Sequence, residues 1–164
     1  MSMLKKAFGL VQFFPLLIFM YAFTYFMSWE AAFEIAGIVA AVIVGFLFIA
    51  RITMDNFMLG TSLFLVLGAV MFLFNVVALE YLYGFYMEAM LFASILFVGI
   101  VTTFFSSTGF IGVAGEAVQV RRASIYLLLG VVVAGVLAIL LHGDVLNGFV
   151  IPWFIVLSLR HVLR

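Results

Sequence analysis

The chain has 164 residues, of which 69% are hydrophobic and 9% are charged. A soluble domain has about 25% charged residues, so this composition excludes a soluble globular protein and indicates an integral membrane protein. Cysteine is absent, which excludes disulfides, thiol catalysis and a cysteine-based metal site.

Six apolar segments can cross a bilayer, whose core is about 30 Å thick and needs about 20 helical residues. We expect helices at residues 7–27, 31–50, 57–79, 81–105, 123–141 and 145–159. The first is expected to remain uncleaved, because no A-x-A-like signal-peptidase site follows it. The last is short and reaches spanning length only if His161–Leu163 lies at the interface and Arg160 extends to the surface. The sequence thus predicts an all-α fold: one transmembrane domain over residues 1–164, a polytopic bundle of six helices.

The connections between these segments are short, with one exception. Residues 28–30 form a turn in which Trp29 is a candidate interfacial anchor. Tyr81, Tyr83 and Tyr86 suggest an aromatic belt, so the start of the fourth helix stays open. The exception is residues 106–122, which can be a cytoplasmic loop or an interfacial segment.

The charged residues divide between alternate gaps of this scheme. The termini and the second and fourth connections hold seven basic and two acidic residues, a net charge of +5. The other gaps, with the helix ends beside them, hold five acidic residues and no basic one. Lys and Arg in short loops stay in the cytoplasm, which predicts that both termini are cytoplasmic. The basic residues are Lys5, Lys6, Arg51, Arg121, Arg122, Arg160 and Arg164, and the five acidic residues opposite them are Glu30, Glu34, Glu80, Glu88 and Asp144.

Small residues spaced by four predict where helices pack, because inside lipid helices associate through close contact. The second segment carries Gly37, Ala41 and Gly45, with a parallel row of Ala32, Ala36 and Ala40 beside it. The fifth segment carries Gly130, Ala134 and Ala138. We expect these two helices to make close contacts, within the bundle or across a dimer.

Two prolines interrupt the first and last segments. Pro15 and Pro152 each remove a backbone hydrogen bond and are expected to kink their helices. Gln12, three positions before Pro15, is placed to donate to a freed carbonyl.

Ionisable side chains at membrane depth are candidates for function. Glu88 lies two turns inside the fourth helix if that helix starts at Tyr81, or at the surface if 81–86 is an interfacial turn. Glu34 has the same ambiguity, and Asn75 lies near the outer end of the third helix. The sharpest site hypothesis is a proton- or cation-binding pocket built from Glu34, Asn75 and Glu88.

No catalytic motif is present. The sequence holds no H-E-x-x-H, G-x-S-x-G or P-loop pattern. His142 and His161 fall on opposite membrane sides in this topology, so they cannot share a metal. The prediction is a non-enzymatic protein without a cofactor or metal, and without a nucleic-acid partner.

One stretch carries a family resemblance. Residues 13–19 read Phe-Phe-Pro-Leu-Leu-Ile-Phe, with Tyr21 soon after. This stretch, the junction from Phe74-Asn75 through Glu80 to Glu88 and the short last helix resemble the bacterial intracellular septation protein A family. The resemblance implies an inner-membrane protein that maintains the envelope and takes part in cell division through protein–protein interaction.

Three functions remain open at this point. The first is a septation-like protein that acts through helix–helix contacts with other membrane proteins or as a homo-oligomer. The second is a small transporter or channel subunit, and the third is an accessory subunit of a larger membrane complex.

Overall fold

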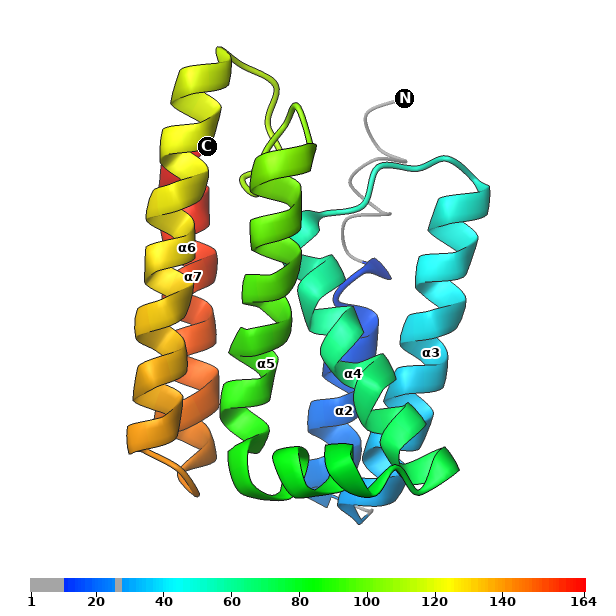
Figure 1. The fold of residues 1–164 in the computed structure, drawn as a ribbon. Coiled ribbons are helices and arrows are strands. Elements are labelled where there is room, and N and C mark those ends of the chain that lie inside the picture. The colour runs from blue at the N-terminus through cyan, green and yellow to red at the C-terminus, as the bar shows by residue number, and fades with distance from the viewer. Residues whose placement is uncertain (1–10, 26–27) are drawn as a thin grey trace. The chain divides into compact units, whose positions relative to one another are not determined.

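The computed structural model describes residues 11–25 and 28–164, and every regular element in them is helical (Figure 1). An all-α fold is therefore confirmed for these residues. Five helical stretches are long and apolar enough to cross a membrane, from α3 to the end of the chain. The predicted segment 7–27 lies partly outside the described residues. The elements are α2 (Phe14–Tyr25), α3 (Trp29–Ile49), α4 (Asn56–Phe74), α5 (Val77–Phe105), α6 (Ala117–Leu140), the π-helix η1 (Leu146–Val150) and α7 (Ile151–Leu163).

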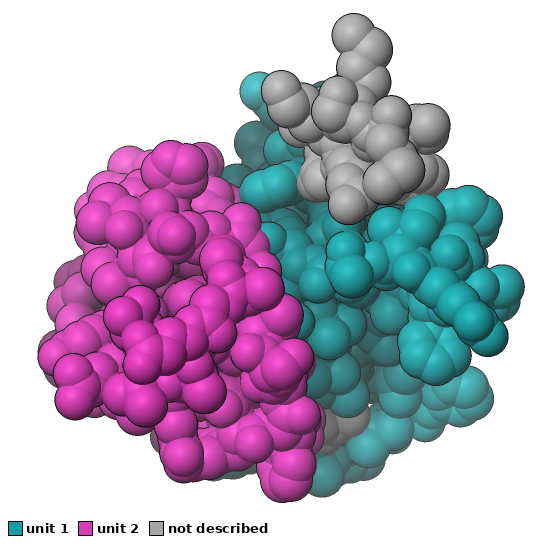
Figure 2. All heavy atoms as spheres, turned by 90° about the horizontal axis from the view of Figure 1, so that it is seen from above, with its two compact units in different colours: residues 1–83 teal, residues 84–164 magenta. Residues whose placement is uncertain are grey.

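The chain divides into two compact units, Met1–Tyr83 and Gly84–Arg164 (Figure 2). The first holds α2, α3, α4 and the first turns of α5. The second holds the rest of α5 together with α6, η1 and α7. The division falls inside α5, where Tyr86 has the non-helical backbone angles φ −127° and ψ 30°.

Side-chain caps set the starts of α3 and α4. The Ser28 hydroxyl accepts a hydrogen bond of 3.3 Å from the Ala31 amide, so α3 starts two residues before the predicted position. Asp55 accepts from the amides of Phe57 and Met58 and starts α4 at Asn56. The Asp55 amide in turn donates to Gln12 Oε1 at 3.0 Å. Gln12 thus joins the approach to α2 to the start of α4, which is a different role from the one predicted.

The core of the first unit combines close backbone approach with an aromatic cluster. Ala32, Ala36 and Ala40 of α3 have no exposed surface. A Cβ on Gly37 would collide with Ala69 of α4, and one on Gly68 would collide with the Phe33 ring. Glycine is needed at both positions because α3 and α4 pack too closely for a side chain. The Phe33, Phe19 and Phe64 rings lie with centroids 4.6–6.3 Å apart.

The boundary between α4 and α5 differs from the prediction of helices at 57–79 and 81–105. Asn75 adopts a left-handed conformation (φ 51°, ψ 49°) and ends α4 at Phe74. A new helix then starts at Val77, and its turns up to Tyr83 run crosswise to α3 and α4 (Figure 1). Hydropathy does not reveal this turn, because the residues on both sides of Asn75 are apolar.

The core of the second unit lies along the buried face of α6. Leu127, Val131, Ala134 and Ala138 follow one another at helical spacing and are buried. After the break at Tyr86, α5 contributes the buried residues Leu91, Phe92 and Ile95, and α7 contributes Trp153 and Val156.

Residues 106–116 form a folded loop that turns back into the second unit. Phe110 is fully buried, and the Ser124 hydroxyl of α6 accepts hydrogen bonds from the amides of Phe110 (2.9 Å) and Ile111 (3.4 Å). Gly109 makes the turn with φ 58°. The helix after the loop starts at Ala117 instead of the predicted 123. The apolar character of the loop follows from its burial.

Both prolines lie at the second residue of a helix. Pro15 follows a turn at residues 12 and 13. Pro152 follows η1, in which the Ile151 amide donates to the Leu146 carbonyl five residues back. The wide π turn accommodates a proline that has no amide hydrogen to donate. Beyond it α7 runs to Leu163 rather than ending at 159.

Arg160 does not reach the surface as the sequence predicted. It lies within α7 with only 5% of its surface exposed. Arg164, after the end of the helix, instead donates from Nε to the Ile111 carbonyl at 2.9 Å. The chain end is thereby tied to the 106–116 loop.

Candidate functional site

Glu88 lies just after the break in α5. The helix from Met87 to Phe105 has 19 residues, which gives a length of about 28 Å at 1.5 Å per residue. This part of α5 alone matches the thickness of a bilayer core. Glu88 therefore occupies the first turn of the straight segment, rather than a position two turns inside it.

The Glu88 side chain is buried and hydrogen-bonded at both oxygens. Oε2 lies 3.1 Å from Nδ1 of His142, and Oε1 accepts from the Gly143 amide at 3.3 Å. Glu88 is 4% exposed, whereas the His142 side chain is half exposed. A buried carboxylate is stable only when such partners replace its water. The pair fixes the start of the straight part of α5 to the turn after α6.

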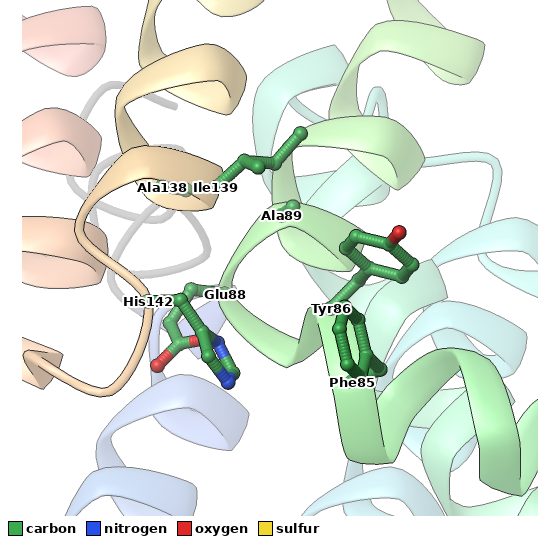
Figure 3. Close-up of a pocket in the computed structure, with 7 residues that line it drawn as sticks. All are labelled: Phe85, Tyr86, Glu88, Ala89, Ala138, Ile139 and His142. Carbon is green, nitrogen blue, oxygen red and sulfur yellow. The ribbon is translucent and has the colours of Figure 1, made fainter.

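A cavity of about 200 Å³ lies beside this pair. Phe85 stacks on the His142 ring with centroids 6.1 Å apart and an interplanar angle of 18°. In Figure 3 the side chains of Glu88 and His142 lie against one another, and Ile139 reaches from α6 toward Ala89 of α5. The cavity thus has one acidic end and otherwise apolar or aromatic walls, since its lining is completed by Tyr86 and Ala138.

An apolar groove of about 310 Å³ continues between α5 and α6. It shares Tyr86, Ala89 and Ile139 with the cavity. Farther along, α5 presents Ala93 and α6 presents Gly135, which leave room between the two helices. The remaining lining residues are Met90, Phe92, Leu96, Val131, Val132 and Val136. Together the two hollows combine a charged group with a long apolar wall.

The turn that carries His142 is held by Asp144. Its carboxylate accepts from the amides of Leu146 and Asn147 and from the Asn147 side chain. The Asn147 side chain is the main cause that lowers the pKa of Asp144, with the two backbone amides adding to it. Asp144 thereby caps the helical residues that follow the turn.

Two of the three residues in the predicted ion site lie in the other unit. Asn75 is exposed and caps the end of α4, so its conspicuous feature is its backbone conformation. Glu34 lies half-buried in α3, four residues after Glu30. The partners found for Glu88 are His142 and Gly143 instead. A role of Glu34 and Asn75 in ion binding stays a prediction.

Only some of the predicted packing residues lie in contacts between helices. Gly37 contacts α4, but Ala41 is exposed and a Cβ on Gly45 would meet nothing within 4 Å. In α3 the buried row is Ala32, Ala36 and Ala40. In α6 the predicted row is buried at Ala134 and Ala138, and a Cβ on Gly130 would come within 2.6 Å of Leu159 of α7.

Sequence reasoning missed His142 as the partner of Glu88. A signal was present, because the charge division placed Glu88 and the turn at 142–144 on the same side of the membrane. The charge division does not reveal the break in α5 at Tyr86, which places Glu88 beside that turn.

Among the described residues, no group of three or more acidic or histidine side chains could hold a metal ion. The arrangement offers one buried carboxylate, one accessible imidazole and an apolar groove. Its chemistry is that of binding or proton exchange. No family model, curated protein or solved structure matches this chain.

Proposed function

We propose that the chain is a multi-pass protein of a bacterial inner membrane with both termini in the cytoplasm. Five helical stretches with the length and composition of membrane spans support a multi-pass protein. Placing both termini on one side also requires the predicted segment 7–27 as a sixth span. The outer faces of these helices are apolar: Val42 and Ile49 of α3 are 66% and 81% exposed, and Val133 of α6 is 60% exposed. Large apolar side chains exposed over whole helices suit lipid rather than water.

The arrangement of charge within the second unit supports the proposed orientation. Arg121 lies over the Phe104 ring at 4.9 Å, and Arg164 binds the Ile111 carbonyl, so these basic residues gather near the 106–116 loop. Glu88 lies at the opposite end of α5, against the turn that holds Asp144. With the basic end of this unit toward the cytoplasm and the acidic end away from it, the charges follow the positive-inside rule.

Cysteine labelling tests this orientation, because the chain has no native cysteine. Ala114→Cys in the 106–116 loop and Glu30→Cys in the first turn of α3 are both at exposed positions. In intact cells an impermeant maleimide should label Glu30→Cys only, and after lysis it should label both. Labelling of Ala114→Cys in intact cells contradicts the orientation.

Within this membrane we propose that the protein acts through helix contacts with other membrane proteins, as a non-enzymatic component of septation or envelope maintenance. The observation that carries the proposal is the outer face of α3. Gly45 there leaves a notch with nothing within 4 Å of its Cβ position, flanked by exposed Ala41 and Phe46. Such a notch lets a second helix approach closely.

Substitution in the notch tests the contact function. Gly45→Leu fills the notch without a clash inside the chain, and Val133→Leu alters an exposed site on α6 as the matched control. After extraction in native lipid particles, Gly45→Leu should lose co-purifying membrane proteins that the parent and Val133→Leu retain. Cells with Gly45→Leu as their sole copy should elongate. Unchanged partners and unchanged cell length for Gly45→Leu contradict the proposal.

A small transporter or channel subunit is the second candidate, favoured by the cavity beside Glu88. Reconstitution into liposomes separates the two functions. Ion flux from a monodisperse monomer without partners, abolished by Glu88→Gln, would replace the contact function with transport.

A further inference from the structure

Two neighbouring hollows between α5 and α6, together called the path, differ in chemistry. They share the lining residues Tyr86, Ala89 and Ile139. Glu88 and Leu96, at the two ends of the α5 wall, are eight residues apart, about 12 Å along the helix axis. All of the path therefore lies within the second unit.

The polar end is suited to a cation. Glu88 supplies a buried carboxylate beside the cavity. Among the described residues that line the two hollows, none is Lys or Arg. Phe85 and Tyr86 add aromatic rings at the same end, and aromatic faces attract ammonium groups. A small inorganic ion would leave these rings and the apolar groove unused.

The other end is suited to a single apolar chain. The groove is lined by aliphatic and aromatic side chains, and small residues at Ala93 and Gly135 keep it open. Its volume of about 310 Å³ is at the lower limit of ordinary ligand sites, which begin near 300 Å³. That volume fits one tail better than the two tails of a bilayer lipid.

We infer that this path binds a free amphiphilic organic cation, an ammonium group with one alkyl tail, with the ammonium at Glu88 and the tail between α5 and α6. Charge complementarity with Glu88 selects the head, and the groove buries the tail. This inference goes beyond the proposed contact function and does not depend on it.

The test uses the full chain in phosphatidylcholine nanodiscs and radiolabelled decyltrimethylammonium, whose charge does not titrate. Binding to empty nanodiscs is subtracted. We expect saturable binding that Glu88→Gln weakens by about tenfold or more, because one partner of a charge pair is lost. Glu30→Gln, a matched carboxylate change at an exposed position of α3, should leave binding unchanged. Decanol, with the same tail and no charge, should not compete.

A further variant keeps the test decisive if Glu88→Gln does not fold. Ala93→Phe fills the groove at an exposed position of α5 and should abolish binding.

Three results overturn the inference. The first is equal binding by Glu88→Gln, or by Ala93→Phe, and the parent. The second is competition by decanol, which would mean that the groove recognises only the tail. The third is loss of probe binding when phosphatidylethanolamine replaces phosphatidylcholine, which would make a bilayer lipid the occupant.

Discussion

The Tyr83 hydroxyl donates a hydrogen bond of 2.8 Å to the main-chain carbonyl of Phe64. The two rings also stack, with centroids 5.4 Å apart and an interplanar angle of 11°. Tyr83 is 2% exposed, so the whole contact is buried. It fastens the turns before the break in α5 to the middle of α4.

Tyr83→Phe should therefore lower the free energy of unfolding by about 1 kcal/mol, since it removes one buried hydrogen bond and keeps the ring. Tyr81→Phe is the control, because Tyr81 is 72% exposed, and surface changes stay within about 0.5 kcal/mol. The measurement is reversible unfolding in bicelles with increasing dodecyl sulfate. Equal midpoints for the two variants would mean that the Tyr83 bond contributes nothing to stability.

Substitution of two glycines of α3 by alanine should change the free energy of unfolding in opposite directions. Gly37→Ala places a methyl group against Ala69 and the Leu65 carbonyl, which should cost about 1–3 kcal/mol through overpacking. Gly45→Ala meets nothing within 4 Å and should stabilise the helix by up to about 1 kcal/mol through helix propensity. Thermal unfolding of both variants in the same lipid measures this difference in stability. A stabilised Gly37→Ala would contradict the close approach of α3 and α4.

Ser124→Ala should loosen the 106–116 loop. The substitution leaves the Phe110 and Ile111 amides without the hydroxyl that accepts from them, and an unsatisfied buried donor costs about 1–3 kcal/mol. Ser94→Ala removes only a bond to the Met90 carbonyl within one helix and serves as the control. Amide hydrogen exchange at residues 109–112 should accelerate in Ser124→Ala alone. Unchanged exchange there would count against this role of Ser124.

Acid should weaken the turn after α6 through Asp144. Its pKa is lowered in the folded protein by the Asn147 side chain, so its contribution is complete above the ordinary carboxyl pKa and is lost as pH falls through the folded value. Asn147→Ala removes that donor, so the loss should begin at a higher pH than in the parent. Exchange of the Leu146 and Asn147 amides, followed from pH 6 to pH 3, measures this. Equal protection of these amides in the parent protein at pH 6 and at pH 3 would contradict this role of Asp144.

Five of the six predicted spans correspond to long apolar helices of the described chain, in the predicted order, but several of their ends could not be predicted. Length and hydropathy locate α3 and α6 because lipid-compatible helices are long and apolar. Asn75 shows the limit: its left-handed conformation ends α4 inside an apolar run, so no window average detects it. The early start of α6 at Ala117 has a different origin, since Gln119, Arg121 and Arg122 end the apolar run while the helix continues through them.

The candidate site was predictable in part. Glu88 is conspicuous in the sequence because carboxylates are rare in apolar helices. Its partner depends on the break at Tyr86 and on the turn built by Asp144, and both are tertiary features. The sequence hypothesis grouped Asn75 and Glu34 with Glu88 in one pocket, but in the described chain they belong to the unit that does not contain His142.

The folded 106–116 loop has a practical consequence for reporter fusions. Hydropathy plots would mark it as a long connection suited to an inserted epitope or a protease site. An insertion at 109–112 would pull Phe110 out of its buried position and break the link between Ile111 and Arg164. A tag placed at the exposed residues 114–116 would spare both contacts. Low expression of a fusion made at 109–112 would therefore report a damaged fold, and would say nothing about which side of the membrane the tag had reached.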